Sequence, residues 1–228
     1  MKRLIIKICG LNSPETLDVA LDCGADMVGF VFFAPSPRHI ELTAARALGA
    51  RARGKALKVA LCVDAADEEL SEIVAALEPD LLQLHGSETP DRAKLIRHRF
   101  GVPVMKALPI ARRDDLLSAR RYETVVDRVL FDARAPREAS RPGGLGRRFD
   151  WELLRGFTCA APFMLSGGLD VDNVAEALRI TAAPGVDVSS GIERAPGEKD
   201  MDKIRAFIAA ARRAVQQPVG LTTLRAGA

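Results

Sequence analysis

Short apolar segments alternate with helix-like segments along almost the whole chain, and this alternation limits the fold more than any other feature. Each apolar segment has the length of a strand and is closed by glycine, proline or a polar residue. The segments expected as strands are 4–10, 26–33, 57–63, 80–86, 102–107, 128–132, 162–165 and 185–188. Helices are expected to follow them, beginning at Pro14, after Thr43, at Glu68, Pro90, Asp114 and Asp150, after Asp170 or Asp172, and after Asp200.

A strand–helix unit repeated eight times predicts a parallel sheet covered by helices. In 228 residues this pattern favours one closed (β/α)8 barrel, a TIM barrel, formed by residues 1–214. An open doubly wound sheet is the main alternative, but it does not readily use eight evenly sized units in so short a chain. Residues 215–228 have no apolar period and include Pro218 and Gly220, so a loosely ordered tail is expected there.

The composition argues against several classes of partner. Net charge is +3 with both signs mixed, and the chain has one Trp and one Tyr, which disfavours nucleic-acid binding. The apolar runs fall short of the roughly 20 residues that a membrane span needs, and the first strand begins too early for a signal peptide. The cysteines are scattered without a metal or disulfide spacing, which indicates a reducing compartment; they are Cys9, Cys23, Cys62 and Cys159. We therefore expect a cytoplasmic protein, a monomer by default, with a dimer as the alternative.

Ionisable side chains and a thiol stand where most of the expected strands end. In a barrel these ends meet on one rim, and active sites of this fold lie there. A single residue of this kind is more often a helix cap or a loop anchor, whereas six on one rim indicate a site. The six are Cys9, Asp64, His85, Lys106, Asp132 and Asp187. The chain has three histidines, of which His85 alone stands at a strand end, so no metal site is expected.

Two glycine-containing loops point to a phosphate group. Ser166-Gly167-Gly168 follows the seventh expected strand, and Ser189-Ser190-Gly191 follows the eighth. Loops in these two positions commonly hold phosphate through backbone N–H groups in this fold. We expect Gly167, Gly168, Ser190 and Gly191 to bind the phosphate of a small molecule. The alternative is that these glycines only make tight turns.

Cys9 and Asp132 are the candidate base and acid. Their strands are well separated around the ring, so their side chains can face one another across a substrate. Lys7 lies on the same face of its strand as Cys9, and a nearby cation lowers a thiol's pKa. The alternatives are that Cys9 is a small buried side chain or a nucleophile, although no Cys-His-Asn pattern supports the latter.

Two further segments complete the expected site. Arg38 follows two prolines in a stiff loop, and its forked guanidinium suits a carboxylate. The long loop 133–148 holds Gly143, Gly144 and Gly146 and has the length and composition of a mobile lid. The alternative for Arg38 is an ordinary surface arginine, and the alternative for the loop is a flexible connector without a role.

These motifs together resemble the phosphoribosylanthranilate isomerase family from the first strand to the last helix. The segments that carry the resemblance are Lys7-Ile8-Cys9-Gly10, Gly24-Ala25-Asp26, Gly29-Phe30-Val31-Phe32, Ser36-Pro37-Arg38, Gln83-Leu84-His85-Gly86, Leu130-Phe131-Asp132, Gly143-Gly144-Leu145-Gly146, Phe149-Asp150-Trp151, Ser166-Gly167-Gly168-Leu169 and 187–193. Leu145 departs from the pattern, since a small polar residue is common at that place in the lid.

The resemblance implies an Amadori rearrangement of N-(5-phosphoribosyl)anthranilate in tryptophan biosynthesis, without a cofactor. It implies that Asp132 is the general acid that opens the ribose ring and that Cys9 is the general base at C2′. It also implies that Arg38 binds the anthranilate carboxylate, and it places His85 and Asp187 among the substrate-binding residues.

Two other functions compete with this one. A histidine-pathway isomerase performs the same rearrangement on a different ribotide, but with an aspartate as base, so Cys9 argues against it. A barrel that only binds a phosphorylated ligand would not need both Cys9 and Asp132, so their joint presence disfavours a non-catalytic role.

Overall fold

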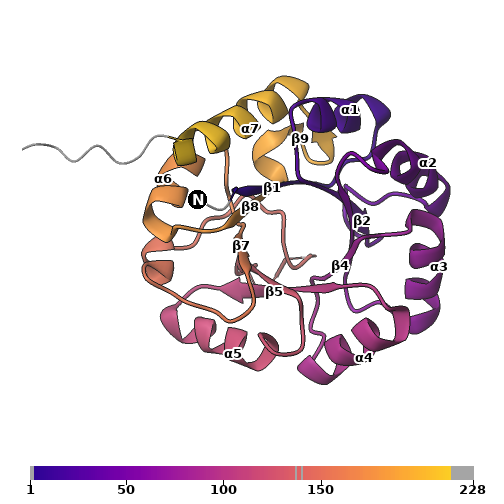
Figure 1. The fold of residues 1–228 in the computed structure, drawn as a ribbon, viewed down its shortest axis with the longest axis horizontal. Coiled ribbons are helices and arrows are strands. Elements are labelled where there is room, and N and C mark those ends of the chain that lie inside the picture. The colour runs from indigo at the N-terminus through magenta and orange to yellow at the C-terminus, as the bar shows by residue number, and fades with distance from the viewer. Residues whose placement is uncertain (1–2, 137, 140, 217–228) are drawn as a thin grey trace, which may run out of the picture.

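The computed structural model describes residues 3–136, 138–139 and 141–216 and confirms the expected (β/α)8 barrel (Figure 1). Eight parallel strands pair in sequence order, and the first pairs with the eighth. The strands are β1 (Ile5–Cys9), β2 (Met27–Phe32), β3 (Leu57–Cys62), β4 (Leu81–Leu84), β5 (Val104–Ile110), β6 (Arg128–Ala133), β7 (Phe163–Leu165) and β8 (Gly185–Val188). An open doubly wound sheet is thereby excluded.

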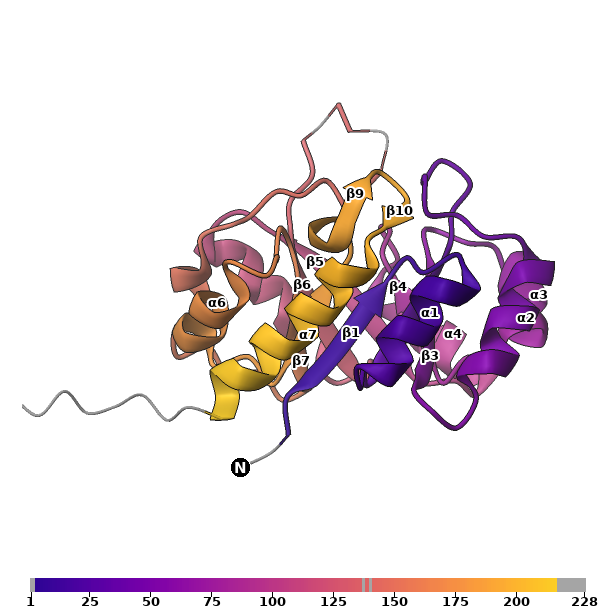
Figure 2. The same ribbon diagram turned by 90° about the horizontal axis from the view of Figure 1, so that it is seen from above.

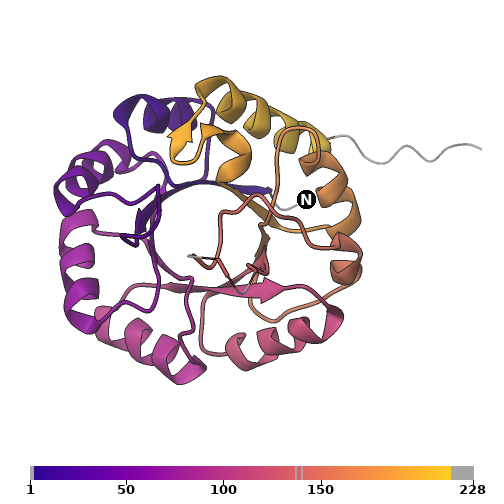
Figure 3. The same ribbon diagram turned by 180° about the vertical axis from the view of Figure 1, so that it is seen from behind.

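Helices surround the strands on the outside of the ring, as Figures 1 and 3 show. They are α1 (Pro14–Asp22), α2 (Leu42–Ala52), α3 (Asp67–Leu77), α4 (Pro90–Phe100), η1 (Arg113–Ser118), α5 (Ala119–Tyr122), η2 (Trp151–Leu154), α6 (Val174–Thr181), η3 (Ser190–Ile192) and α7 (Met201–Gln216), where η marks a 3-10 helix.

Capping residues explain several of the helix starts. The Ser13 side chain accepts a hydrogen bond from the backbone of Thr16, and Pro14 occupies the first helical position, as the sequence predicts. Asp200 accepts the N–H groups of residues 202 and 203 at the start of α7. One expected start is wrong, because α2 has Glu41 rather than Thr43 at its N-cap. At α6 the helix is assigned from Val174, and Asp170 Oδ1 accepts the N–H groups of residues 172 and 173 at 3.0 Å, so this aspartate caps the turn that leads into the helix.

The apolar core has two parts on the two faces of the barrel wall. The larger part packs the outward-facing strand residues, such as Ile8 and Cys62, against the helices. The smaller part fills the barrel interior below the site with side chains from several strands; it consists of Met27, Val59, Leu81, Met105, Ala107, Leu130 and Met164. Because side chains alternate along each strand, inward-facing residues closer to the carboxyl ends of the strands than this smaller part of the core point into the carboxyl end of the barrel.

A short hairpin after β8 was not expected from the sequence. Its strands are β9 (Glu193–Ala195) and β10 (Glu198–Lys199), and they pair antiparallel. Figure 2 shows the hairpin at the end of the barrel opposite the start of β1. Gly197 adopts φ +85°, and a Cβ there would lie 2.3 Å from the carbonyl oxygen of Pro37, so the turn packs directly on the loop after β2. The Pro196-Gly197 pair is the sequence signal for this turn.

The expected boundary after residue 214 falls inside a helix. α7 continues through Val215 to Gln216, and its apolar face still packs against the core at Ala214. The rest of the expected tail, 217–228, lies outside the described residues. No helix in the described ranges is long and apolar enough to cross a membrane.

Candidate active site

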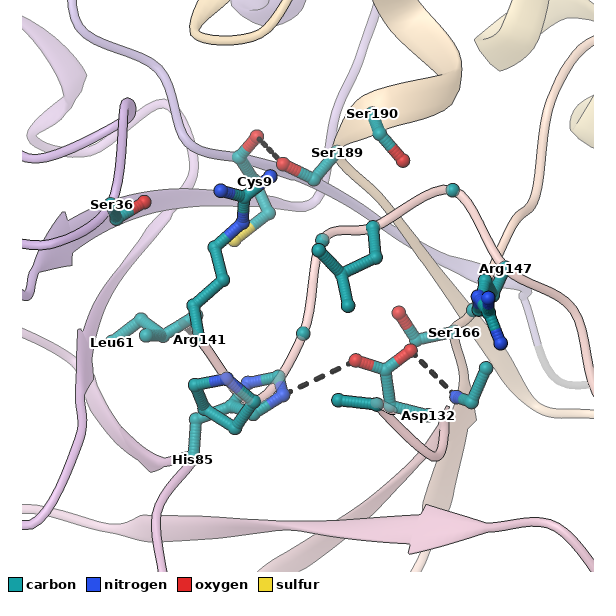
Figure 4. Close-up of a pocket in the computed structure, with 18 of the residues that line it drawn as sticks. Cys9, Ser36, Leu61, His85, Asp132, Arg141, Arg147, Ser166, Ser189 and Ser190 are labelled. Carbon is teal, nitrogen blue, oxygen red and sulfur yellow. Dashed lines mark hydrogen bonds and ion pairs between the residues drawn. The ribbon is translucent and has the colours of Figure 1, made fainter. Parts of the chain in front are cut away.

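A pocket opens at the carboxyl ends of the strands and brings most of the expected site residues together (Figure 4). Its empty space amounts to about 750 Å³, open solvent at the mouth included. The expected residues that line it are Cys9, Arg38, His85, Asp132, Gly143, Gly144, Gly146, Gly167, Gly168, Asp187 and Ser190. Cys9 on β1 and Asp132 on β6 come from well-separated strands of the ring, and Figure 4 shows both at the pocket.

Cys9 sits in a tightly packed corner of the pocket floor. The Lys7 side chain below it is fully buried, and its Nζ lies 2.8 Å from Asp187 Oδ1 on β8. A Cβ at residue 29 would lie 2.9 Å from Cys9 Sγ and 3.1 Å from Lys7 Cε, so glycine is needed there for both side chains to fit. The two oxygens of Asp187 have different partners. Oδ1 accepts a hydrogen bond from Lys7, and Oδ2 accepts one from Ser166 Oγ at 3.4 Å.

The pKa of the Cys9 thiol is raised, which contradicts the lowering expected from Lys7. Burial is the largest cause, Lys7 acts in the opposite direction, and Asp187 adds to the increase. For Lys7, burial lowers the pKa, but Asp187 and Cys9 raise it more, so the ammonium stays charged. The cation is thus present as predicted, but burial outweighs its effect on the pKa of the thiol, and Asp187 acts against it as well.

Asp132 lies at the end of β6 and is 6% exposed. Its Oδ1 accepts the backbone N–H of Ala133 at 2.8 Å, and its Oδ2 lies 3.2 Å from His85 Nε2. His85 Nδ1 in turn lies 3.0 Å from Nε2 of the buried Gln83. The carboxyl group is therefore held on two sides and presents its remaining edge to the pocket.

Arg38 belongs to a buried charge cluster that the sequence analysis missed. Its Nε and Nη2 donate to the two carboxylate oxygens of Glu193 at 2.7 and 2.8 Å, and Nη2 also donates to the Gly144 carbonyl at 3.1 Å. Lys199 Nζ donates to Glu193 Oε1 at 2.8 Å. Glu193 and Lys199 come from the unexpected hairpin, which explains why they were overlooked.

The same cluster reaches the backbone of Cys9. Lys199 Nζ donates to the carbonyl and hydroxyl oxygens of Ser189 at 2.9 and 3.1 Å, and the Ser189 hydroxyl donates to the Cys9 carbonyl at 3.1 Å. Burial lowers the pKa of Lys199 to about 8, although Glu193 counteracts it. Burial acts to raise the pKa of Glu193, but Arg38 and Lys199 lower it overall. Two cations share one carboxylate, so this side of the pocket carries a surplus positive charge.

The loops after β7 and β8 offer backbone donors. No hydrogen bond between described residues occupies the N–H groups of Gly167, Gly168, Ser190 or Gly191. The first three residues line the pocket, whereas Gly191 is not among the lining residues. A Cβ at Gly191 would lie 1.9 Å from the Leu169 carbonyl oxygen, so this glycine lets the two loops pack together.

The loop after β6 runs across the end of the barrel where the strands end (Figures 2 and 3), and its residues line the pocket and approach two of its sides. A Cβ at Gly143 would lie 2.7 Å from Asp132 Oδ2 and from His85 Nε2, and a Cβ at Gly144 would lie 2.5 Å from Arg38 Nη1. Arg141, also missed, points from this loop into the pocket in Figure 4. Its Nε is buried without a hydrogen-bond partner in the described part of the chain.

Two of the six expected rim residues lie outside this pocket. Lys106 is buried on β5 and pairs with Glu88 Oε2 at 2.8 Å, because β5 runs on to Ile110 and Lys106 is therefore not at its end. Asp64 accepts the backbone N–H and the hydroxyl of Ser87 at 2.7 and 3.1 Å and anchors that loop. No group of three or more His, Cys, Asp and Glu side chains in the described ranges is placed to hold a metal ion.

The fold and the pocket define a (β/α)8 barrel with a carboxyl group and a thiol that line one pocket at the carboxyl ends of the strands. The family model for N-(5'-phosphoribosyl)anthranilate isomerase matches residues 6–210. An isomerase of that name from Bradyrhizobium sp. (strain ORS 278) is 62% identical over 216 residues, covering 95% of this chain and 99% of the relative. One from Nitrobacter winogradskyi is 62% identical over 92% of this chain and 94% of the relative. The chain belongs to the N-(5'-phosphoribosyl)anthranilate isomerase family and is an isomerase.

Solved structures of the same family share the fold. The phosphoribosyl anthranilate isomerase of Thermotoga maritima superposes with a TM-score of 0.83 at 32% identity, over 92% of this chain and 99% of that one. A second structure, in complex with reduced 1-(o-carboxyphenylamino)-1-deoxyribulose 5-phosphate, gives a TM-score of 0.79 at 31% identity, over 92% of this chain and 99% of that one.

Proposed function

We propose that this protein isomerises N-(5-phosphoribosyl)anthranilate to 1-(2-carboxyphenylamino)-1-deoxyribulose 5-phosphate in tryptophan biosynthesis, with Asp132 as general acid and Cys9 as general base. The family membership supports the reaction. The observation that supports the two roles is the placement of Cys9 and Asp132 on well-separated strands around one pocket. An acid and a base so placed can act on neighbouring atoms of one bound sugar.

In this reaction Asp132 gives its proton to the ribose ring oxygen. The bond from C1′ to that oxygen breaks, and the anthranilate nitrogen forms a C=N⁺ bond to C1′. Cys9, as thiolate, removes the C2′ proton, and the C–H electron pair forms the C1′=C2′ double bond and neutralises the nitrogen. The resulting enol then tautomerises to the ketone. Because the iminium acidifies the C2′ proton, a thiolate is a sufficient base.

The phosphate is assigned to the loops after β7 and β8. Unoccupied N–H groups on Gly167, Gly168, Ser190 and Gly191 can donate to phosphate oxygens, and N–H groups gathered in this way form an anion-binding concavity. Of these residues, Gly191 also makes room for the two loops to pack against each other. The substrate would then lie with its phosphate at these loops and its sugar between Asp132 and Cys9.

The anthranilate carboxylate is assigned to the opposite side, where positive charge is in surplus. Arg38 Nη1 has no acceptor among the described residues, so its donors remain for a ligand. Arg141 adds a second guanidinium from the loop above. A charge-assisted hydrogen bond of this kind contributes about 1.5–3 kcal/mol.

Arg38→Ala is therefore expected to weaken binding of reduced 1-(o-carboxyphenylamino)-1-deoxyribulose 5-phosphate, the reduced product analogue, by roughly tenfold to hundredfold. The dissociation constant is measured by titration calorimetry. The fold should persist because Lys199 still pairs with Glu193. Arg38→Lys serves as the matched variant, since it keeps the charge but loses the fork that holds Glu193. An unchanged dissociation constant in Arg38→Ala would remove Arg38 from the carboxylate site.

A second prediction concerns the lid, for which we propose Gly143, Gly144 and Gly146. Gly144 has φ +69° and lies on Arg38, whereas Gly156 has φ +68° and has nothing within 4 Å of an added Cβ. Gly144→Ala should lower kcat/KM by roughly tenfold or more by displacing the lid, and Gly156→Ala should leave it unchanged. Since both variants carry the same backbone strain, equal kinetics in the two would contradict a role for the lid.

We also infer that the enzyme acts as a monomer in the cytoplasm. Among the residues that the structure describes, the exposed large apolar side chains are Leu57, Leu95, Leu117, Met201 and Val215. They are spread over β3, α4, η1 and the two ends of α7 rather than gathered in one patch, as a stable interface would require. Light scattering should give a mass near 24.6 kDa, and twice that value would indicate the dimer.

A further inference from the structure

Gln83 is a polar side chain in the apolar interior of the barrel. It lies on β4, it is fully buried, and its Oε1 has no hydrogen-bond partner in the described part of the chain. Leu81, two residues earlier on the same face of β4, and Met105, the register partner of Gln83 on β5, are both apolar. Burial of an amide with an unsatisfied oxygen costs stability, so a residue of this kind calls for a reason other than packing.

The one described partner of the Gln83 side chain is His85. Gln83 Nε2 lies 3.0 Å from His85 Nδ1, and an amide nitrogen can only donate. Nδ1 must then be the acceptor, which puts the proton of the neutral imidazole on Nε2. Nε2 faces Asp132 Oδ2 at 3.2 Å, so this tautomer directs an N–H donor at the proposed acid. The opposite amide orientation would protonate Nδ1 instead.

The buried ion pair of Lys106 and Glu88 fixes the backbone around His85. Lys106 Nζ donates to the carbonyl oxygens of Leu84 and Gly86, on either side of His85, at 3.3 and 2.7 Å. Glu88 accepts from Lys106 and from the Gly86 N–H. The charged groups around the imidazole are thus Asp132 on β6, Lys106 on β5, Glu88 in the β4–α4 loop and Arg141 in the lid.

We infer that Gln83 is a positioning residue, which sets the His85 tautomer so that His85 Nε2–H stabilises the Asp132 carboxylate formed when the ribose ring opens. That carboxylate would accept from His85 on one oxygen and from the Ala133 N–H on the other. Donors fixed in advance where charge develops lower a barrier without reorganisation. The inference rests on the proposed function, since it gives Asp132 the role of acid.

The first test is the ¹⁵N NMR spectrum of wild-type protein labelled at its three histidines, His39, His85 and His98. A His85→Gln variant identifies the signals of His85. We expect a protonated Nε2 and an unprotonated Nδ1 in the wild type, and the reversed pattern in Gln83→Glu, whose carboxylate accepts from Nδ1–H. A wild-type His85 protonated on Nδ1 would overturn the inference, and this readout needs no variant of Gln83 to fold.

The second test is kinetic. Gln83→Met keeps the volume and removes the donor, and it should lower kcat by roughly tenfold or more, with binding of the reduced product analogue unchanged. The loss should vanish in an Asp132→Asn background, because both changes act on one group. If Asp132→Asn is inactive but Gln83→Met has full kcat, the inference fails and the proposed function stands. If Asp132→Asn itself keeps full activity, the proposed acid is wrong.

Discussion

Asp132→Asn is expected to reduce kcat by about 10²–10⁴-fold, the usual contribution of a general acid. Asparagine has the same shape, and its amide oxygen can still accept the Ala133 N–H, so the fold and the pocket should be kept. It cannot give a proton to the ribose ring oxygen, so ring opening should fail. The measurement is the steady-state rate of loss of anthranilate-type fluorescence, with thermal unfolding and analogue binding measured on the same samples.

Asp64→Asn is the matched control for that variant. Asp64 also follows a strand, but it holds Ser87 outside the active-site pocket. Its φ of 49° is in the left-handed region, which asparagine tolerates. Asp64→Asn should keep wild-type turnover. Equal activity of Asp132→Asn and Asp64→Asn would show that the carboxyl group at β6 is not the acid.

Cys9→Ala is expected to have the second large effect, again about 10²–10⁴-fold in kcat. Removal of the thiol leaves no group of suitable basicity beside C2′, while the small side chain still fits against Gly29. Cys62→Ala is the control, because Cys62 is equally buried but faces the helix layer. Comparable losses in the two variants would indicate a packing role for Cys9 rather than a chemical one.

The raised pKa of Cys9 also gives a prediction for pH. In Asp132→Asn the residual rate depends on the base, and the fraction of thiolate grows as pH rises towards a pKa above the ordinary value of 9.0. The residual rate of Asp132→Asn should therefore increase between pH 7 and 9, by up to ~tenfold per unit. In the double variant with Cys9→Ala this increase should disappear. A flat profile in Asp132→Asn would contradict thiolate catalysis.

The barrel topology and the shared strand face of Lys7 and Cys9 were predictable because they depend on local sequence. Alternating βα units define the topology, and the two-residue period of a strand places Lys7 and Cys9 on one face. The pKa of Cys9 was not predictable in the same way. It depends on burial and on Asp187, 180 residues from Lys7 in sequence, which only the closed barrel brings beside it.

Arg38 shows the same limit. The stiff loop around it indicates a presented guanidinium, but its partner Glu193 lies 155 residues away in a hairpin of two very short strands. Segments of that length carry too little periodicity to be recognised as strands. The expectation that Lys106 and Asp64 belong to the site was wrong for a related reason. The side chain of a residue at the end of an apolar run can turn to a neighbouring loop instead of the pocket.

The most direct test of the account is to add wild-type protein to freshly prepared N-(5-phosphoribosyl)anthranilate and follow its fluorescence. We predict a loss of fluorescence at a rate proportional to protein concentration, saturable by substrate and inhibited by the reduced product analogue. Correctly folded protein that binds the analogue but leaves the fluorescence unchanged would contradict the account and would indicate a barrel that binds this ligand without converting it.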